Sequence, residues 1–501
     1  MSTNTTRIPV IVGVGQINDR PDNPHEGLDP VGLMAAALRM ADVDGGGGWL
    51  ESVESVALVD QIAMRHLNPL PDKLCDALAI NPVRRYQTPL PMGDSPIMLL
   101  NEAANRIGAG EITVAAIVGA EALRTAAKLA ALRQGGSAFD HNIMRSRKNK
   151  SAPSYLAQYG LVAPVDCYPI YENATRAAWG QSLAEGQAES GTIWSLFSQV
   201  AEQNEGAWIR QPKSAEEIIE PTPDNRPIAF PYTKLMVANS SVNQGAGFIV
   251  TSLAEARRRG VPEERLIYVG NGAAAHENDD FLARDRYDFS AGMQVSITET
   301  LALNQLGIAE IDHAELYSCF PCVPKMARRI LDWPVDRPAS VFGGLTFGGG
   351  PIGNYMSHAV VSMVETLRAG GTNGLLFANG GYATHNHSIV LSSQRIEAAE
   401  FPRSFDYQAQ ADDLRGPVPK LDETYSGRGK IESYTVFYNR DGTPRDGTII
   451  ARNSVGSRFC AKVSGDDTLL ITWLTDGMSE PVGTDGTGVR GKDGLLYWQG
   501  D

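Results

Sequence analysis

The same order of strands and helices is predicted twice along this chain, and this repetition constrains the fold most. In the first half, "PVIVGVG" and "ITVAAIVG" are predicted buried strands, accompanied by helices such as "PVGLMAAALRMA". In the second half, the strand in "DHAELYSCF" follows a helix, and the helix after "GGGPIG" leads into the strand "GLLFANGG". This similarity indicates an internally duplicated β/α unit. Alternating strands and helices predict an α/β fold whose sheet is largely parallel and covered by helices on both faces.

Changes in composition divide the chain into four predicted domains. Residues 1–123 form the first half, and 124–255 are an inserted loop domain with the return to that half. Residues 256–398 form the second half. Residues 399–501 differ, because "KIESYTVFYNRDGTPRDGTIIARN" alternates like strands joined by Asp-Gly turns. We expect this last domain to be a small all-β barrel.

Charge, hydropathy and cysteine content exclude several classes of protein. A net charge of -14 argues against a nucleic-acid-binding protein. No apolar run approaches ~20 residues, so we expect no membrane span. The first residues lack the features of a signal peptide, and five sparse cysteines favour reduced thiols in a cytoplasmic protein. The pair Cys319 and Cys322 has no second pair or histidine at ligand spacing, so we expect no metal site.

The glycine run "FGGLTFGGGPIGN", at residues 342–354, does not match a phosphate-binding loop. A Walker-type loop needs a lysine after its glycines to neutralise phosphates, and none follows here. The run contains GxGxxG, but no acidic residue lies at a strand end about 20 positions further on. Nucleotide binding is therefore disfavoured.

The run instead resembles the thiolase loop GGAIALGHPIGAS, with Pro351 and Gly353 in register. "DHAELYSCF" resembles the ELHDCF motif of the sterol-carrier-type thiolases, and "NSSVNQGAGFIVTS" resembles their SxxSDGAAA segment. "NEAANRIGAGEITVAAIVGAEA" is similar to the thiolase stretch EAARRIRAGEADVVIAGGVES. The resemblance covers about residues 7–398 and implies a duplicated, five-layered fold with an inserted loop domain.

The last domain resembles the OB-fold domain that accompanies thiolase-like proteins in acyl-CoA and steroid side-chain degradation. The segments "GRGKIESYTVFY" and "DGTIIARN" carry this resemblance. In some thiolase-like aldolases without a nucleophile this domain is a separate subunit, whereas here it is predicted to be fused.

Three catalytic positions of the thiolase pattern are changed in this sequence. The nucleophilic cysteine of the NxCxSG motif falls on Gly93, and the histidine of the GHP motif falls on Gly350. The second cysteine, of the CxG motif, falls near Phe377. The resemblance therefore implies a thiolase site without its covalent nucleophile.

Four residues remain as candidates for proton transfer. Cys319 matches the cysteine of HDCF, which in such thiolases can act as an acid or base, and Tyr317 stands at its histidine. Tyr382 and His385 follow the last catalytic loop. Structural alternatives stay open, because Cys319 can be a small apolar core residue, Tyr317 a strand cap and His385 a packing residue.

The resemblance implies a coenzyme A thioester as substrate or ligand, with no covalently bound cofactor. The expected contacts come from two serines and two glycine-rich turns: Ser240, Ser241, Gly349, Gly350, Asn379 and Gly380. Backbone N–H groups in the two turns are expected to hold the thioester carbonyl as an enolate forms.

Three functions stay open at this point. The family implies a thiolase-like acyltransferase of the acetyl-CoA acetyltransferase kind, but acyl exchange needs a nucleophile. The first alternative is a retro-aldolase that cleaves β-hydroxyacyl-CoA in lipid or steroid side-chain degradation. The second is a non-catalytic protein that binds coenzyme A thioesters. We expect a monomer or homodimer, with no nucleic-acid or membrane partner.

Overall fold

The computed structural model describes residues 4–133 and 154–500, so parts of the first, second and last predicted domains lie outside the described residues. The first half contains β1 (Pro9–Asn18), α1 (Pro30–Asp44), β2 (Ser55–Leu58), α2 (Pro71–Leu78), β3 (Arg84–Gln87), α3 (Ser95–Ala109), β4 (Val114–Ala122) and β7 (Asn243–Ser252). After α9 (Leu253–Arg258), the second half contains β8 (Ile267–His276), α10 (Ala291–Leu303), β9 (His313–Leu316), α11 (Cys322–Leu331), α12 (Tyr355–Ala369), β10 (Asn373–Gly380) and β11 (His385–Ser392).

Two further groups of elements complete the described chain. Between β4 and β7 lie α4 (Leu123–Arg133), α5 (Tyr155–Gln158), α6 (Pro164–Ala178), α7 (Leu183–Gln203), α8 (Ala215–Ile219), β5 (Pro227–Ala229) and β6 (Tyr232–Thr233). After β11 follow α13 (Gln408–Leu414), β12 (Gly427–Tyr438), β13 (Pro444–Arg452), β14 (Arg458–Ser464), α14 (Thr468–Thr475), β15 (Asp485–Arg490) and β16 (Leu496–Gly500).

The described strands of the two halves form one sheet in the order β3-β2-β4-β7-β1-β8-β11-β10-β9. The predicted duplicated α/β fold is confirmed, but the prediction of a largely parallel sheet is wrong. Within this sheet β2 pairs in parallel with β3 and β4, and β9 with β10, while the other junctions are antiparallel. The reason is that β11 returns beside β10 through a short turn, and β7 returns antiparallel beside β4 after the inserted segment that contains α4 to α8.

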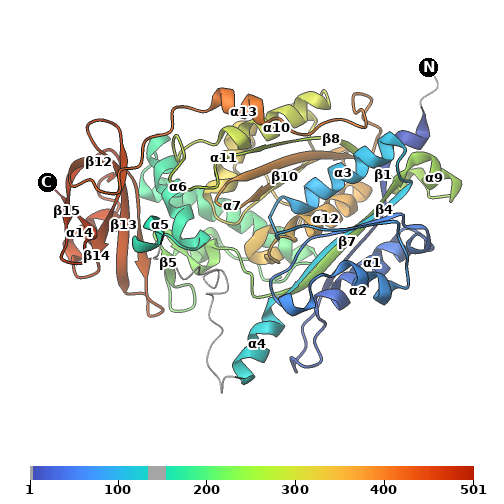
Figure 1. Ribbon diagram of the computed structural model, residues 1–501, viewed down its shortest axis with the longest axis horizontal. Coiled ribbons are helices and arrows are strands. Elements are labelled where there is room, and N and C mark those ends of the chain that lie inside the picture. The colour runs from blue at the N-terminus through green and yellow to red at the C-terminus, as the bar shows by residue number, and fades with distance from the viewer. Residues whose placement is uncertain (1–3, 134–153, 501) are drawn as a thin grey trace.

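Helices α3 and α12 form the central layer of the five-layered fold (Figure 1). They contact each other and strands of both halves, whereas α1 and α10 cover the outer faces. In α3, Ile97, Leu100, Ala104 and Ile107 are buried with helical spacing. The helix ends at Gly110, whose φ of 75° is left-handed. Because α3 begins just after Gly93 and α12 just after the glycine run, both helices start at the same end of the central layer.

The C-terminal strands close a five-stranded barrel, which confirms the predicted OB-like unit. The order is β13-β14-β16-β15-β12, and β12 also pairs with β13. The sheet continues from β12 into β5 and β6, and the Phe230 N–H donates to the Val436 carbonyl over 2.8 Å. The barrel therefore shares main-chain hydrogen bonds with the segment inserted between β4 and β7.

Other global features follow from the described residues. None of the helices in residues 4–133 and 154–500 is long and apolar enough to cross a membrane. The five cysteines are buried free thiols. Within the same ranges, no group of three or more potential metal ligands is found.

Candidate active site

A cavity of about 340 Å³ lies where the start of α3, the start of α6, the chain after β9, the glycine run and the end of β10 meet. Most of its walls are apolar side chains, such as Met92, Val165 and Phe320. Six of the ten predicted site residues line it: Ser240, Tyr317, Cys319, Gly350, Asn379 and Gly380. The other four, Ser241, Gly349, Tyr382 and His385, lie outside its lining.

No side chain at position 93 fits this cavity as it stands. A β-carbon built on Gly93 would lie 2.1 Å from the Asn379 carbonyl oxygen and 2.6 Å from the Tyr317 hydroxyl oxygen. Both distances are far below van der Waals contact. The Tyr317 hydroxyl therefore fills the space in which the resemblance placed the nucleophile.

Tyr317 presents an unengaged hydroxyl to the cavity. The residue is 8% exposed, and among the described residues its hydroxyl has no hydrogen-bond partner. Burial, together with Cys319 and Asp94, raises the pKa of Tyr317 well above its usual value. The phenol is therefore protonated at neutral pH and can donate a hydrogen bond or a proton. It can act as a base only when another group takes its own proton.

Cys319 is a neutral thiol at the same wall. Burial raises the pKa of Cys319 to about 12, although a hydrogen bond with Tyr168 acts in the opposite direction. A thiol with this pKa is an acid, not a nucleophile, near neutral pH. Cys322 is fully buried, and its Sγ donates to the Tyr168 carbonyl at 3.8 Å.

The glycine run is held in place by buried side chains. Ser340 Oγ accepts hydrogen bonds from the N–H groups of Gly343 at 2.7 Å and Gly344 at 3.1 Å. Ser318 Oγ accepts from the Leu345 N–H at 3.2 Å. These donors are already used inside the protein, so this part of the run has no free N–H groups for a phosphate.

Three of the predicted ligand contacts, Gly349, Gly350 and Ser241, are engaged in contacts within the protein. The Gly350 N–H donates to the Asn239 carbonyl over 2.8 Å, so it is not free to hold a thioester oxygen. Gly349 has a φ of 104°, and a β-carbon there would lie 2.2 Å from the Gln244 side chain. The Ser241 N–H donates to Asn239 Oδ1 at 3.2 Å.

The turn between β10 and β11 is fixed by its own polar side chains. Asn379 Nδ2 donates to Asn386 Oδ1 over 2.9 Å, and Asn379 Oδ1 accepts from the Tyr168 hydroxyl at 3.2 Å. The Tyr382 hydroxyl donates to the Val162 carbonyl over 3.0 Å. Tyr382 therefore connects the turn to the chain before α6 and points away from the cavity.

Behind Gly93, the structure gathers a carboxyl group and two histidines. Asp94 is 6% exposed and lies 4.0 Å from His385 Nδ1. The His385 ring packs edge-on against His276, with ring centroids 4.7 Å apart. The sequence analysis assigned no role to Asp94 or His276, although the position of Asp94 next to Gly93 at a helix start was a usable signal.

Two arginines connect the barrel to the turn at this site. Arg458 of β14 is fully buried, and its Nη1 donates to the Leu282 carbonyl and, over 2.6 Å, to the Arg284 carbonyl. Arg284 Nη2 donates to the Tyr382 carbonyl over 2.9 Å and to Thr384 Oγ1 over 3.0 Å. The barrel is thereby bonded, through one intermediate segment, to the residues that precede His385.

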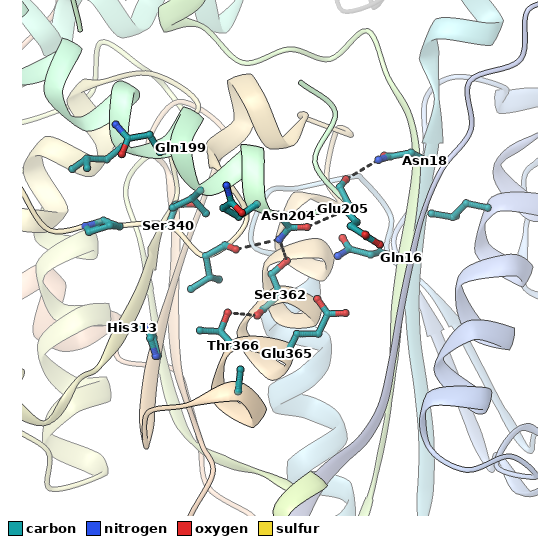
Figure 2. A pocket seen from close by; sticks show the side chains of 18 of the residues that line it. Gln16, Asn18, Gln199, Asn204, Glu205, His313, Ser340, Ser362, Glu365 and Thr366 are labelled. Carbon is teal, nitrogen blue, oxygen red and sulfur yellow. Dashed lines mark hydrogen bonds between the residues drawn. The ribbon is translucent and has the colours of Figure 1, made fainter. Parts of the chain in front are cut away.

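A second, larger cavity of about 1000 Å³ lies between β1, α7 and α12 (Figure 2). Asn204 Nδ2 donates to Ser362 Oγ over 2.9 Å within it. Its described lining contains the carboxylates of Glu205 and Glu365 but no lysine or arginine, and none of the predicted site residues. This charge does not suit a phosphate-bearing ligand such as coenzyme A.

The duplicated five-layered fold defines a thiolase-fold protein. Residues 407–487 match the family described as thiolase-like protein type 1 additional C-terminal domain. A monomeric SCP2-thiolase-like protein type 1 from Mycobacterium smegmatis is 29% identical, with a TM-score of 0.82, over 99% of this chain and 100% of that chain. The chain is a thiolase-superfamily protein, similar to the type 1 SCP2-thiolase-like protein, and its C-terminal residues match the additional domain of that type.

More distant structures share the fold alone. The Ltp2–ChsH2(DUF35) aldolase is 16% identical, with a TM-score of 0.59, over 78% of this chain and 99% of that chain. Human mitochondrial 3-ketoacyl-CoA thiolase in complex with CoA is 14% identical, with a TM-score of 0.57, over 78% of this chain and 99% of that chain. Among proteins with curated descriptions, none matches this sequence.

Proposed function

We propose that this protein binds a coenzyme A thioester in the 340 Å³ cavity and cleaves β-hydroxyacyl-CoA by a retro-aldol reaction. The observation that carries the proposal is the Tyr317 hydroxyl, which lies 2.6 Å from where a β-carbon on Gly93 would be. Acyl exchange needs a covalent nucleophile, and a phenol in its place supports proton transfer instead.

The proposed reaction needs no co-reactant. The β-hydroxyl loses its proton, the bond between Cα and Cβ breaks, and its electron pair moves into the thioester enolate. Protonation at Cα then gives a shorter acyl-CoA, while Cβ leaves as the carbonyl carbon of a ketone or aldehyde. The site must therefore accept one proton, supply one proton and stabilise an oxyanion.

The described residues offer groups for these tasks. Tyr317 is a buried hydroxyl with no hydrogen-bond partner among them, and Cys319 is a buried neutral thiol in the same wall. Either can donate to the thioester oxygen or to Cα, because each is protonated at neutral pH. The apolar walls favour an aliphatic or sterol-like acyl group, as in lipid or steroid side-chain degradation.

Coenzyme A binding is part of the proposal. A CoA-bound thiolase and an aldolase share this fold, which supports a thioester ligand in the equivalent cavity. The 29% identical relative is described as monomeric, and we propose a monomer here too. Light scattering during gel filtration tests this, and a mass of twice the chain's 53.9 kDa would contradict it.

The experiment that tests the function is a mass-spectrometric inventory of CoA species. Purified protein is incubated with acetoacetyl-CoA plus free CoA, and separately with branched and sterol-like β-hydroxyacyl-CoAs. We expect only the second panel to be cleaved, to a carbonyl compound and a shorter acyl-CoA. Acetyl-CoA from the first mixture would instead establish acyl transfer. Binding without any turnover would favour a non-catalytic thioester-binding protein.

A further inference from the structure

The carboxyl group of Asp94 is buried without the partners that such a group usually has. Asp94 stands at the N-terminal end of α3 but does not cap it with its side chain. Among the described residues, no hydrogen-bond donor reaches the carboxylate from another side chain, and its ion-pair partner is His385 at 4.0 Å. Its own backbone N–H donates to it, whereas a buried charged group is usually also paired closely with another side chain.

The same carboxyl group reaches the wall of the cavity. Gly380 lines the cavity, and a β-carbon built on it would lie 3.4 Å from Asp94 Oδ1 and 2.9 Å from the Gly93 nitrogen. The glycine therefore leaves room for the carboxylate just behind the cavity wall, and Asp94 is near enough to Tyr317 for its charge to raise the pKa of the phenol.

A partly exposed histidine lies between Asp94 and solvent. His385 is 29% exposed and lies 3.9 Å from Asp279, which is 91% exposed. On its other side, His385 packs on His276, whose Nδ1 is buried and has no hydrogen-bond partner in the described chain. The titratable groups close enough to affect one another's pKa values in this cluster are, besides Asp94, His385, His276, Tyr317, Asp279 and Asp406.

We propose that Asp94 and His385 form a proton relay that takes the proton of Tyr317 during catalysis and exchanges it with solvent. The inference rests on the proposed function of this cavity. The β-hydroxyl gives its proton to the Tyr317 oxygen as the phenolic proton moves to Asp94 and then to His385. A second proton reaches Cα from the Cys319 thiol. Solvent then takes up the proton from His385 and reprotonates Cys319, so the protein returns to its starting state.

The electrostatics of the cluster agree with this geometry. Burial raises the pKa of Asp94, while His385 and His276 act in the opposite direction. Burial also lowers the pKa of His276, together with His385, while Asp94 raises it. A carboxyl group with a raised pKa exchanges protons more readily near neutral pH than an exposed one.

Asp94→Asn tests the relay, because it keeps the shape of the side chain and removes the proton acceptor. Asp406→Asn is the matched control, since Asp406 acts on His276 but lies away from the cavity. Two activities are measured over a range of pH: cleavage of β-hydroxyacyl-CoA, and exchange of the α-protons of acyl-CoAs with heavy water by mass spectrometry. CoA-thioester affinity is measured alongside.

We expect Asp94→Asn to lower cleavage about 10²-fold or more, with affinity intact and with the acid limb of the wild-type pH profile lost. It should keep α-proton exchange, because the Cα proton passes through Cys319 and not through the relay. Asp406→Asn should keep both activities. Unchanged rates and profile in Asp94→Asn would overturn the relay and leave the retro-aldol reaction standing. Loss of α-proton exchange together with cleavage in Asp94→Asn would overturn the relay, because it would show a defect of the whole site and not of one proton path. A wild-type protein that cleaves no β-hydroxyacyl-CoA would overturn the retro-aldol reaction, and with it the relay that rests on it.

Discussion

The hydroxyl oxygen of Tyr317 lies 2.6 Å from the point that a β-carbon on Gly93 would occupy. The two positions compete for one space, so Gly93→Cys should not restore a thiolase. We expect this variant to be less stable by about 1–3 kcal/mol, because the added atoms also meet the Asn379 carbonyl. Chemical denaturation measures the loss, and intact-protein mass spectrometry after incubation with acetyl-CoA measures acylation.

Gly93→Ala is the control, because it adds the clash without a thiol and should be destabilised similarly. A stable Gly93→Cys variant that becomes acylated would contradict this assignment. It would show that the Tyr317 side chain moves aside easily.

Tyr317→Phe and Tyr382→Phe separate catalytic from structural hydroxyls. The Tyr317 hydroxyl faces the cavity, so we expect its loss to lower kcat for cleavage about 10²–10⁴-fold with thioester affinity unchanged. The Tyr382 hydroxyl donates to the Val162 carbonyl, so its loss should cost about 1 kcal/mol of stability and little activity. Steady-state kinetics and thermal unfolding of both variants give the comparison, and the reverse ranking would move catalysis to Tyr382.

The Cys319 thiol should resist alkylation in the folded protein. Burial raises its pKa to about 12, so little thiolate exists at neutral or mildly basic pH. We expect iodoacetamide at about pH 8 to label native protein slowly and to label all five cysteines after denaturation. Peptide mapping identifies the sites. Rapid labelling confined to Cys319 would reveal a reactive thiolate and bring covalent catalysis back into consideration.

His358 should make the fold sensitive to acid. Burial lowers the pKa of His358 to about 3, whereas an unfolded histidine titrates near 6.5. Between those values the unfolded chain binds a proton that the native state excludes. The free energy of unfolding is therefore unaffected by this histidine above about pH 6.5, and it decreases as the pH falls towards about 3. Urea unfolding at about pH 7 and about pH 5 should show a smaller loss for His358→Gln than for the wild type.

Much of the fold was predictable because burial repeats with a regular period. The helix expected in "PVGLMAAALRMA" is α1, since its buried apolar residues recur at helical spacing from Leu33 through Ala37 to Ala41. The resemblance placed the nucleophile at Gly93, and this assignment stays a prediction. The direction of the return strands was not visible, because an apolar strand such as β7 reads the same in a parallel or an antiparallel sheet.

The candidate site was predictable only in part, because its polar partners come from distant segments. Tyr382 follows the last catalytic loop in sequence, but its hydroxyl donates to the Val162 carbonyl, which the sequence did not predict. His385 and His276 meet through the antiparallel register of β11 and β8, which pairs these two residues directly. No local pattern encodes such a register, so the cluster around Asp94 needed the three-dimensional structure.

Arg458→Met should disturb the site from a distance. The guanidinium is fully buried and is paired with Glu432, and it also holds the carbonyls of Leu282 and Arg284. Removing it leaves the Glu432 carboxylate without one of its charge partners, so we expect a loss of about 3–5 kcal/mol. Activity should fall with stability in this variant. Arg458→Lys keeps the charge but not the forked donors, and it should recover only part of both. Full activity in a destabilised Arg458→Met would break this link.

The hydrogen bonds between β5 and β12 determine when this part of the sheet can form during synthesis. During synthesis β5 emerges long before β12. The edge of β5 that pairs with β12 therefore stays unpaired until β12 has been synthesised. The wall that α6 gives the cavity also packs on β12 and is completed at the same late moment. A chain released early should therefore expose that edge and depend on chaperones, and activity should appear only after the last strands have joined the sheet.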